Sequence, residues 1–308
     1  MISAISHLSR LARAGFVFAR EGVFAMIDPT QVPVPARTAL SIARLFERRG
    51  IIGKTQRVST ALTQLGPTYV KLGQFLATRP DLVGVTLARD LESLQDKMPP
   101  FPQVQAETIV ANSLGRPLAE VYSSFGPPVA AASIAQVHKC EIVGENGPKS
   151  VAVKVLRPDV ERRFRLDLDA FTYAAGRAET LSAEARRLRL IETVATLRRS
   201  VALEMDLRLE AAALSEMAEN TKSDPDFRVP AIDWDRTAKD VLTMEWIDGT
   251  PLNDIATLKA KGFDLRHLGA AVIQTFLRHA LRDGFFHADM HPGNLFVDNE
   301  GLRYRRTD

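Results

Sequence analysis

Residues 284–297 read G-F-F-H-A-D-M-H-P-G-N-L-F-V, and this stretch indicates more about the fold than any other part of the chain. An acid, Asp289, is followed five residues later by an amide, Asn294, with an apolar, strand-like segment directly behind it. The Pro-Gly pair between them favours a bend that points both side chains into one pocket. An acid in such a pocket can accept a hydroxyl proton, and an amide oxygen can hold Mg²⁺. The stretch therefore predicts a loop that serves phosphate chemistry.

Phosphotransferases of the protein-kinase type use this acid and this amide at this spacing. A second interpretation makes His287, Asp289 and His291 a metal triad. It is the weaker of the two, because the sequence places no further acid or histidine beside these residues to support the metal ligands.

The composition is that of a globular protein. The chain has 308 residues, 45% hydrophobic and 25% charged, which is enough for two domains or one bilobal domain. The formal net charge is only +3, so no nucleic-acid partner is expected. The single cysteine, Cys140, excludes an intrachain disulfide and fits a reducing compartment. No stretch approaches the roughly 18 apolar residues of a transmembrane helix, and no secretory signal is evident.

Three parts follow one another along the chain. Residues 1–104 are expected to be a helical extension, which ends at the proline-rich boundary M-P-P-F-P, residues 98–102. Residues 105–247 combine strand-like runs, at 134–142 and 151–156 among others, with an Ala-, Leu- and Arg-rich segment. Residues 248–308 begin with a helical pattern that leads into the Asp289 loop.

The segment 160–219 lacks proline and predicts two long helices. Strands are expected to return at 227–232 and 241–246.

Lys154 lies in the run V-A-V-K-V, whose alternation puts its ammonium on the face opposite Val153 and Val155. Alone, this pattern is typical of a solvated strand lysine. With the Asp289 loop downstream, the favoured role is neutralisation of the α- and β-phosphates of ATP, with a glutamate from the next helix holding the lysine in place.

Three acids could be that partner. Glu204 and Asp206 form E-x-D, and Glu210 lies six residues past Glu204, about 600° round a continuous helix. The offset would let one acid meet Lys154 while another faces a different part of the pocket. The alternative is that all three are surface acids, although the leucines among them favour a half-buried position.

The segment that should cover phosphates is unusual. A kinase has a glycine-rich loop there, whereas this chain has Ala130, Ala131, Ala132 and Ser133. Alanine carries a Cβ and resists positive φ, so we expect a stiffer cover that wraps phosphates less readily. A Pro-Pro pair in front and a strand behind favour a loop or a short helix cap. Further upstream, Lys71 and Gln74 of K-L-G-Q share one helix face, and the glycine between them permits close approach of another backbone.

Taken together, these motifs resemble the UbiB family, also called the ADCK family, of atypical protein-kinase-like proteins. The resemblance covers about residues 62–297 and rests on five ordered motifs: K-x-G-Q at 71–74, the Ala-rich loop at 130–133, Lys154, E-x-D at 204–206 and H-x-D-x-H-P-G-N at 287–294. It implies an α+β fold, kinase-like and bilobal, with an N-terminal helical extension.

The resemblance also implies cofactors and roles. ATP and Mg²⁺ would bind with Lys154 paired to Glu210, Asp289 as the base or water-orienting acid, and Asn294 on the metal. The hinge backbone would hydrogen-bond the adenine at Glu245 and Ile247. The K-x-G-Q helix would fold over the pocket and bring Lys71 and Gln74 near Glu204 and Asp206. That arrangement would exclude protein substrates and favour ATP hydrolysis or a small lipid-like substrate.

Members of this family support ubiquinone biosynthesis at the membrane. The expected partners are a nucleotide, a prenylated quinone precursor or another lipid, a membrane surface and other ubiquinone-biosynthesis proteins. The expected location is the bacterial cytoplasm, with a peripheral position at the inner membrane as the alternative. Two other functions stay open: a non-catalytic module that responds to ATP or lipid, and a small-molecule kinase like the aminoglycoside phosphotransferases, which also use an H-x-D-x-x-x-x-N loop.

One kinase element departs from the pattern. The acid of D-F-G is expected about 13 residues beyond the amide. Asp308 lies 14 residues past Asn294, but no Phe-Gly follows it, and basic residues precede it instead of an apolar strand. We therefore expect an incomplete C-lobe, as in a truncated chain, and slow or absent phosphoryl transfer unless Asp308 takes over this role.

Overall fold

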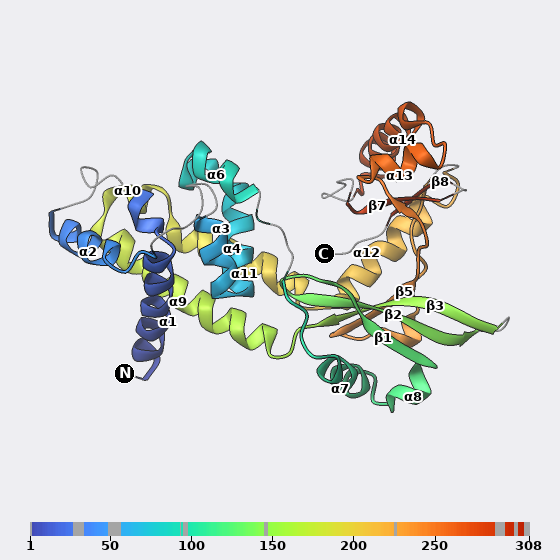
Figure 1. Cartoon of the computed structure of the whole chain (residues 1–308), viewed down its shortest axis with the longest axis horizontal. Helices are drawn as coiled ribbons and strands as arrows, with labels where there is room; N and C mark the ends of the chain where they lie inside the picture. The colour runs from blue at the N-terminus through green and yellow to red at the C-terminus, as the bar shows by residue number, and fades with distance from the viewer. Residues whose placement is uncertain are drawn as a thin grey trace. The chain divides into compact units, whose positions relative to one another are not determined.

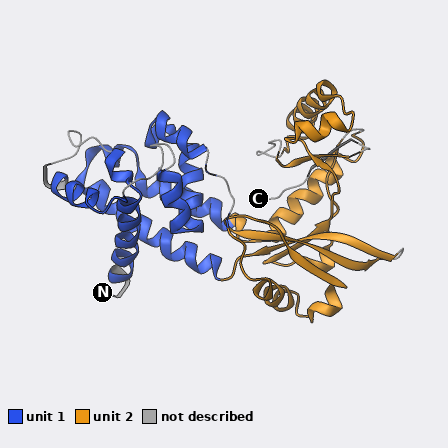
Figure 2. Cartoon of the chain, in the orientation of Figure 1, with its two compact units in different colours: residues 1–98, 159–202 blue, residues 99–158, 203–308 orange. Residues whose placement is uncertain are grey.

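A computed structural model describes residues 2–26, 34–48, 57–92, 94, 98–144, 147–224, 227–286, 293–298 and 301–304. The chain divides into two compact units (Figure 2). Unit 1 comprises residues 1–98 and 159–202, and unit 2 comprises residues 99–158 and 203–308. The predicted segment 105–247 is therefore divided between the units, because the helices of residues 159–202 pack with the N-terminal helices.

Unit 1 is helical. Its elements are α1 (Ile2–Arg20), η1 (Val23–Met26), α2 (Val34–Arg44), α3 (Arg57–Leu65), α4 (Pro67–Ala77), α5 (Pro80–Val83), α6 (Val85–Glu92), α9 (Val160–Leu181), α10 (Ala183–Arg187) and most of α11 (Leu190–Glu204). The second segment is tied to the first by polar contacts: Asp167 of α9 accepts hydrogen bonds from Arg10 of α1 and from Thr68 of α4.

Helix α4 carries the K-x-G-Q motif, and it starts at a proline and ends before Arg79. Gly73 is needed there for a different reason from the expected one. A Cβ at this position would lie 2.7 Å from Leu62 Cδ1 and 3.0 Å from Leu94 Cδ1. Leucine side chains, and not another backbone, therefore fill the space that the glycine leaves.

Unit 2 contains an antiparallel sheet of β1 (Ser124–Ala131), β2 (Ala135–Gly144), β3 (Gly147–Leu156) and β5 (Val241–Glu245), in that order. Helices α7 (Gln103–Leu114) and α8 (Leu118–Val121) lie along one face, and α12 (Leu207–Asn220) lies on the other (Figure 1). Val151, Val153 and Val155 of β3 pack into the core under α7 and α8. Since side chains alternate along a strand, Lys154 points to the face of α12, as predicted.

A buried polar network reinforces this core. His138 of β2 bonds through Nδ1 to the Gly126 carbonyl at 2.8 Å and through Nε2 to the Gln136 side-chain nitrogen at 2.9 Å. A carbonyl only accepts and an amide nitrogen only donates, so the ring carries its proton on Nδ1 and is neutral. Gln136 also bonds to both backbone groups of Phe101, the residue that leads into α7.

The prediction of two long helices over 160–219 is wrong, since four helices occupy this segment. The first break is at Ser182, whose side chain accepts a hydrogen bond from the Ala185 N–H, and Arg189 follows with φ at 50°. The last break separates α11 from α12 at Asp206, whose carboxylate accepts from the Arg208 N–H. Serine and aspartate satisfy the free N–H groups of a new helix, so they allow a break without glycine or proline.

A second sheet in unit 2 has the order β4 (Phe227–Arg228), β8 (Gly301–Tyr304), β7 (Leu295–Asp298) and β6 (Thr250–Pro251). The remaining elements are η4 (Trp234–Arg236), α13 (Ile255–Ala260), α14 (Leu265–Arg278) and the π-helical η5 (His279–Asp283). The strand expected at 227–232 is confined to its first two residues. Strand β8, which contains the basic Arg303, pairs with both β7 and β4.

No helix of the described residues is both long enough and apolar enough to cross a bilayer.

Candidate functional site

Lys154 and Glu210 form a buried ion pair. The Lys154 Nζ lies 3.2 Å from each carboxylate oxygen of Glu210. The lysine side chain is 1% exposed and the glutamate 11%. The lysine comes from the middle of β3, and the glutamate comes from the first turn of α12, where the end of the helix dipole also favours an acid. The structure thus brings together the two residues whose pairing the family resemblance implied.

The break before α12 changes the geometry expected for the acids. Glu204 ends α11 and Asp206 caps α12, so the three acids do not share one continuous helix. They line one open cavity of about 200 Å³ nevertheless, together with Ile134 from the turn between β1 and β2. Hydrogen bonds from Arg208 hold the pKa of Asp206 below its usual value. Asp206 is therefore a charged group at the rim of this cavity.

The Ala-rich segment is only in part the loop that the sequence predicted, and no part of it is a helix cap. Ala130 and Ala131 belong to β1 and pair with β2, while Ala132 and Ser133 form the buried turn between the two strands. Alanine fits an extended strand, and pairing with β2 outweighs its preference for helix. The covering element is therefore a β-hairpin.

Arg157, which the motifs did not single out, fastens this hairpin. Its Nε donates to the Ala132 carbonyl at 2.8 Å, and its backbone N–H donates to the Ile134 carbonyl at 2.8 Å. Its Nη2 also donates to the Pro99 carbonyl at 2.9 Å. The arginine holds the turn from the end of β3, so the hairpin is less free to move than a glycine-rich loop. In the sequence, the feature that could have indicated this role is the Arg-Pro pair directly after the strand.

The expected hinge follows β5. The Glu245 N–H donates to the Ala231 carbonyl and the Trp246 N–H to the Ser150 carbonyl. Among the described residues, the Ile247 N–H has no such partner, so it is the donor of this segment that a base could meet. The Glu245 side chain is held by Arg228 at 2.7 and 2.8 Å. Burial raises the pKa of Glu245, but the bonds from Arg228 and the Ala231 N–H outweigh it and lower this pKa overall.

Asn294 is fully buried directly before β7, and the apolar segment behind it is the strand that the sequence predicted. Asp289, His287 and His291 lie outside the described residues, as does Asp308. The roles of the loop acid and the metal-triad alternative therefore stay predictions. Among the described residues, no group of three acids, histidines or cysteines could hold a metal ion.

Lys71 and Gln74 are half-buried on α4 of unit 1, whereas Glu204 and Asp206 belong to unit 2. The expected closeness of these two pairs also stays a prediction. A larger cavity in unit 2, about 350 Å³, is lined by sheet residues such as Ile142 and Val151 and by residues 231–235. We place the candidate site at the smaller cavity, because Glu210, the partner of Lys154, lines it.

This chain is similar to several known proteins. The family model described as "ABC1 atypical kinase-like domain" matches residues 93–308. "Probable protein kinase UbiB" of Marinobacter nauticus is 41% identical over 297 residues, which are 96% of this chain and 54% of that protein. The protein of the same name from Xanthomonas euvesicatoria is 38% identical over 302 residues, with the same two coverages. The chain spans about half the length of these curated relatives.

A solved structure is also similar. The complex of Rv3197 with erythromycin from Mycobacterium tuberculosis matches with a TM-score of 0.55 and 26% identity, over 89% of this chain and 66% of that one. The prediction of an α+β, kinase-like fold is confirmed.

Proposed function

The chain belongs to the ABC1 family of atypical kinase-like proteins, and we propose that it binds ATP with Mg²⁺ and acts as an ATPase or as a phosphotransferase for a small lipid-like molecule. The activity would support ubiquinone biosynthesis. The relatives named UbiB and the order of the sequence motifs support this proposal.

The Lys154–Glu210 pair carries the proposal. A buried ammonium costs several kcal/mol of desolvation, and a buried ion pair often does not repay that cost in stability. A protein that needed only stability would be better served by two apolar side chains there. The cost is explained if the ammonium meets phosphate oxygens in the adjoining cavity.

Each residue then has one task. Lys154 holds the α- and β-phosphates, and Glu210 fixes the direction of its ammonium. Asn294 contributes an oxygen to Mg²⁺, which neutralises the charge on the phosphates when bound. Asp289 orients the attacking water or hydroxyl and takes its proton. The Ile247 N–H meets the adenine at the hinge.

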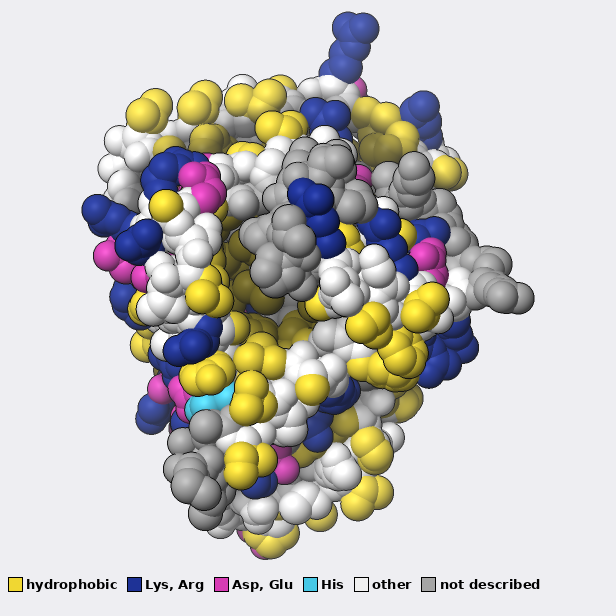
Figure 3. Space-filling view, turned by 90° about the vertical axis from the view of Figure 1, so that its left-hand side faces the viewer, with side chains coloured by type: hydrophobic (Ala, Val, Ile, Leu, Met, Phe, Trp, Pro, Cys, Tyr) yellow, Lys and Arg dark blue, Asp and Glu magenta, His cyan; other side chains and the backbone are white. Residues whose placement is uncertain are grey.

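Unit 1 has an apolar and basic surface that suits contact with a membrane, where a lipid-like substrate would reside. Apolar side chains lie exposed among lysines and arginines on the face that Figure 3 shows. On α1, Ile5, Leu8 and Phe16 are 64%, 53% and 51% exposed, and they follow one helix face. Phe16 contacts Phe46, which is itself 55% exposed beyond α2. A membrane surface with anionic lipids would cover these apolar groups and attract the basic ones.

Vesicle sedimentation tests this surface. Replacing Leu8 and Phe16 by serine should reduce binding to anionic vesicles, whereas replacing Leu181, an exposed leucine at the end of α9, should not. Equal binding by all variants would remove the membrane from the proposal.

A small-molecule substrate is also consistent with the erythromycin complex of the similar Rv3197.

An ATPase assay on the purified chain tests the activity. We expect slow Mg²⁺-dependent phosphate release that is lost in Asp289→Asn and kept in Asp235→Asn, which changes an exposed acid of η4. Nucleotide binding without turnover would favour the second candidate, a binding module that responds to ATP. Absence of both would reject the proposal.

A further inference from the structure

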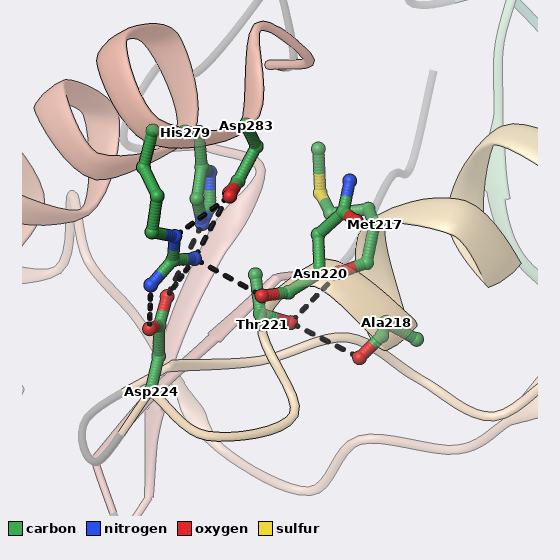
Figure 4. Close-up of polar contacts among 8 residues, drawn as sticks. Met217, Ala218, Asn220, Thr221, Asp224, His279 and Asp283 are labelled. Carbon is green, nitrogen blue, oxygen red and sulfur yellow. Dashed lines mark hydrogen bonds and ion pairs between the residues drawn. The ribbon is translucent and has the colours of Figure 1, made fainter.

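A polar cluster joins the C-terminal end of α12 to η5 (Figure 4). The Arg282 Nη1 donates to Asp224 Oδ1 at 2.6 Å, and Nη2 donates to Asp224 Oδ2 at 3.2 Å and to the Asn220 carbonyl at 3.0 Å. The same guanidinium also bonds both oxygens of Asp283, at 2.6 and 2.9 Å. One side chain thus holds two carboxylates and the last carbonyl of α12.

This cluster differs from an ordinary surface ion pair. Arg282 is 43% exposed, but the Asp224 side chain is only 4% exposed. A planar guanidinium has five donors in a fixed fork, and no other side chain can serve all three acceptors together. Beside the cluster, the Thr221 hydroxyl donates to the Met217 carbonyl of α12. The end of α12 is therefore fixed by specific geometry as well as by packing.

A buried histidine lies beside the cluster. His279 is 1% exposed, its Nε2 is 3.8 Å from Asp224 Oδ2, and neither ring nitrogen has a hydrogen-bond partner among the described residues. Burial lowers the pKa of His279, which keeps the ring neutral. A metal ion between His279 and Asp224 is disfavoured, because Arg282 already occupies both carboxylate oxygens. We call this cluster, which connects α12 to η5, the α12–η5 joint; it is not a ligand site.

The joint lies at the opposite end of α12 from Glu210. Glu210 is in the first turn of α12 and Asn220 is its last residue, ten residues or about 15 Å away. A tilt of about 4° at the joint would move Glu210 by about 1 Å, which exceeds what a hydrogen bond tolerates. On the other side, Arg282 lies in a π-helical turn followed by Gly284 at φ 62°, directly ahead of the loop that carries Asp289. Turns of this type occur often at functional sites.

We propose that Arg282 is a positioning residue that fixes α12 against η5, so that Glu210 aligns Lys154 with the phosphates. This inference rests on the proposed nucleotide site, which it deepens. Arg282 touches no reacting atom; it acts through the helix.

The test compares Mg-ATP with adenosine. Arg282→Ala should weaken Mg-ATP binding about ten-fold, because only the phosphates depend on the alignment of Lys154. Adenosine affinity should stay unchanged, since the base meets the hinge. Arg282→Lys keeps the charge but cannot serve three acceptors, so it should weaken Mg-ATP about three-fold. Arg266→Ala, at an exposed arginine in the first turn of α14, is the matched control and should bind both ligands normally.

The outcomes separate the two levels of the proposal. If the unaltered chain binds no Mg-ATP, the proposed function fails and this inference fails with it. If both Arg282 variants bind Mg-ATP as tightly as the unaltered chain does, only the positioning role of Arg282 is overturned. A parallel loss of adenosine affinity would also overturn it, because general loosening of the fold explains that result. Should Arg282→Ala not fold, the comparison is made with Arg282→Lys.

Discussion

Removing the carboxylate of Glu210 should destabilise unit 2 even without nucleotide. Glu210→Ala leaves the ammonium of Lys154 buried at 1% exposure without its carboxylate. Breaking a buried pair from one side costs about 3–5 kcal/mol. Because Glu210 itself is 11% exposed, water can partly replace it, so we expect the lower end, about 3 kcal/mol. For a folding unit of this size, that corresponds to a fall of about 6–12 °C in Tm.

A double variant separates the charge effect from packing. Lys154→Met with Glu210→Leu replaces the pair by apolar side chains of similar volume, so its stability should lie within about 1 kcal/mol of the unaltered chain. Thermal unfolding without nucleotide measures the stability of Glu210→Ala and of the double variant. The control is Glu216→Ala, which removes an exposed acid of the same helix. A destabilising effect of the unpaired ammonium is excluded if Glu210→Ala melts like Glu216→Ala, or if the double variant is as unstable as Glu210→Ala.

Three further predictions concern the hairpin, the core and the K-x-G-Q helix. Arg157→Ala removes the hydrogen bonds to the hairpin turn and should weaken Mg-ATP binding by about 1–2 kcal/mol, or roughly ten-fold. Calorimetric titration measures this affinity. The control Arg116→Ala should bind Mg-ATP normally, because Arg116 bonds to the Asp235 carbonyl instead. Burial lowers the pKa of His138 from 6.5, so the unfolded chain binds the proton more readily and stability should fall as the pH drops below about 6.5. Thermal midpoints between about pH 7.5 and pH 5.5 should fall less in His138→Gln, and an identical slope would contradict this assignment. Gly73→Ala forces a methyl group against a leucine at 2.7 Å and should cost about 1–3 kcal/mol in denaturant unfolding. Gly269→Ala has open space in α14 and should stabilise by about 0.5–1 kcal/mol, so equal effects would show that crowding is not the cause.

The sheet face to which Lys154 points could be predicted from the sequence, because side chains alternate strictly along a strand. A residue next to Val153 and Val155 in an alternating run must point away from them, and the core contacts agree. The limits of α4 were equally predictable, since proline starts a helix cheaply and a residue before proline ends one. Local rules were sufficient at these places.

Other features depend on contacts between distant residues. The Ala-rich segment extends because β2 pairs with it, although alanine alone favours helix. The break at Asp206 had a local signal, an aspartate that can cap a helix, but the leucine pattern on both sides hid it. The joint at Arg282 had no signal, because Asp224 lies 58 residues earlier in the chain.

The most direct test of the nucleotide site is the shift of Tm that Mg-ATP produces in the chain and in Lys154→Ala. At 100 times its Kd, a ligand stabilises by about 2.7 kcal/mol, which should raise the Tm of unit 2 by about 5–10 °C. We predict that this shift disappears in Lys154→Ala and persists in Lys149→Ala, an exposed lysine of the same strand. An undiminished shift in Lys154→Ala would contradict the assignment of this ammonium to the phosphates.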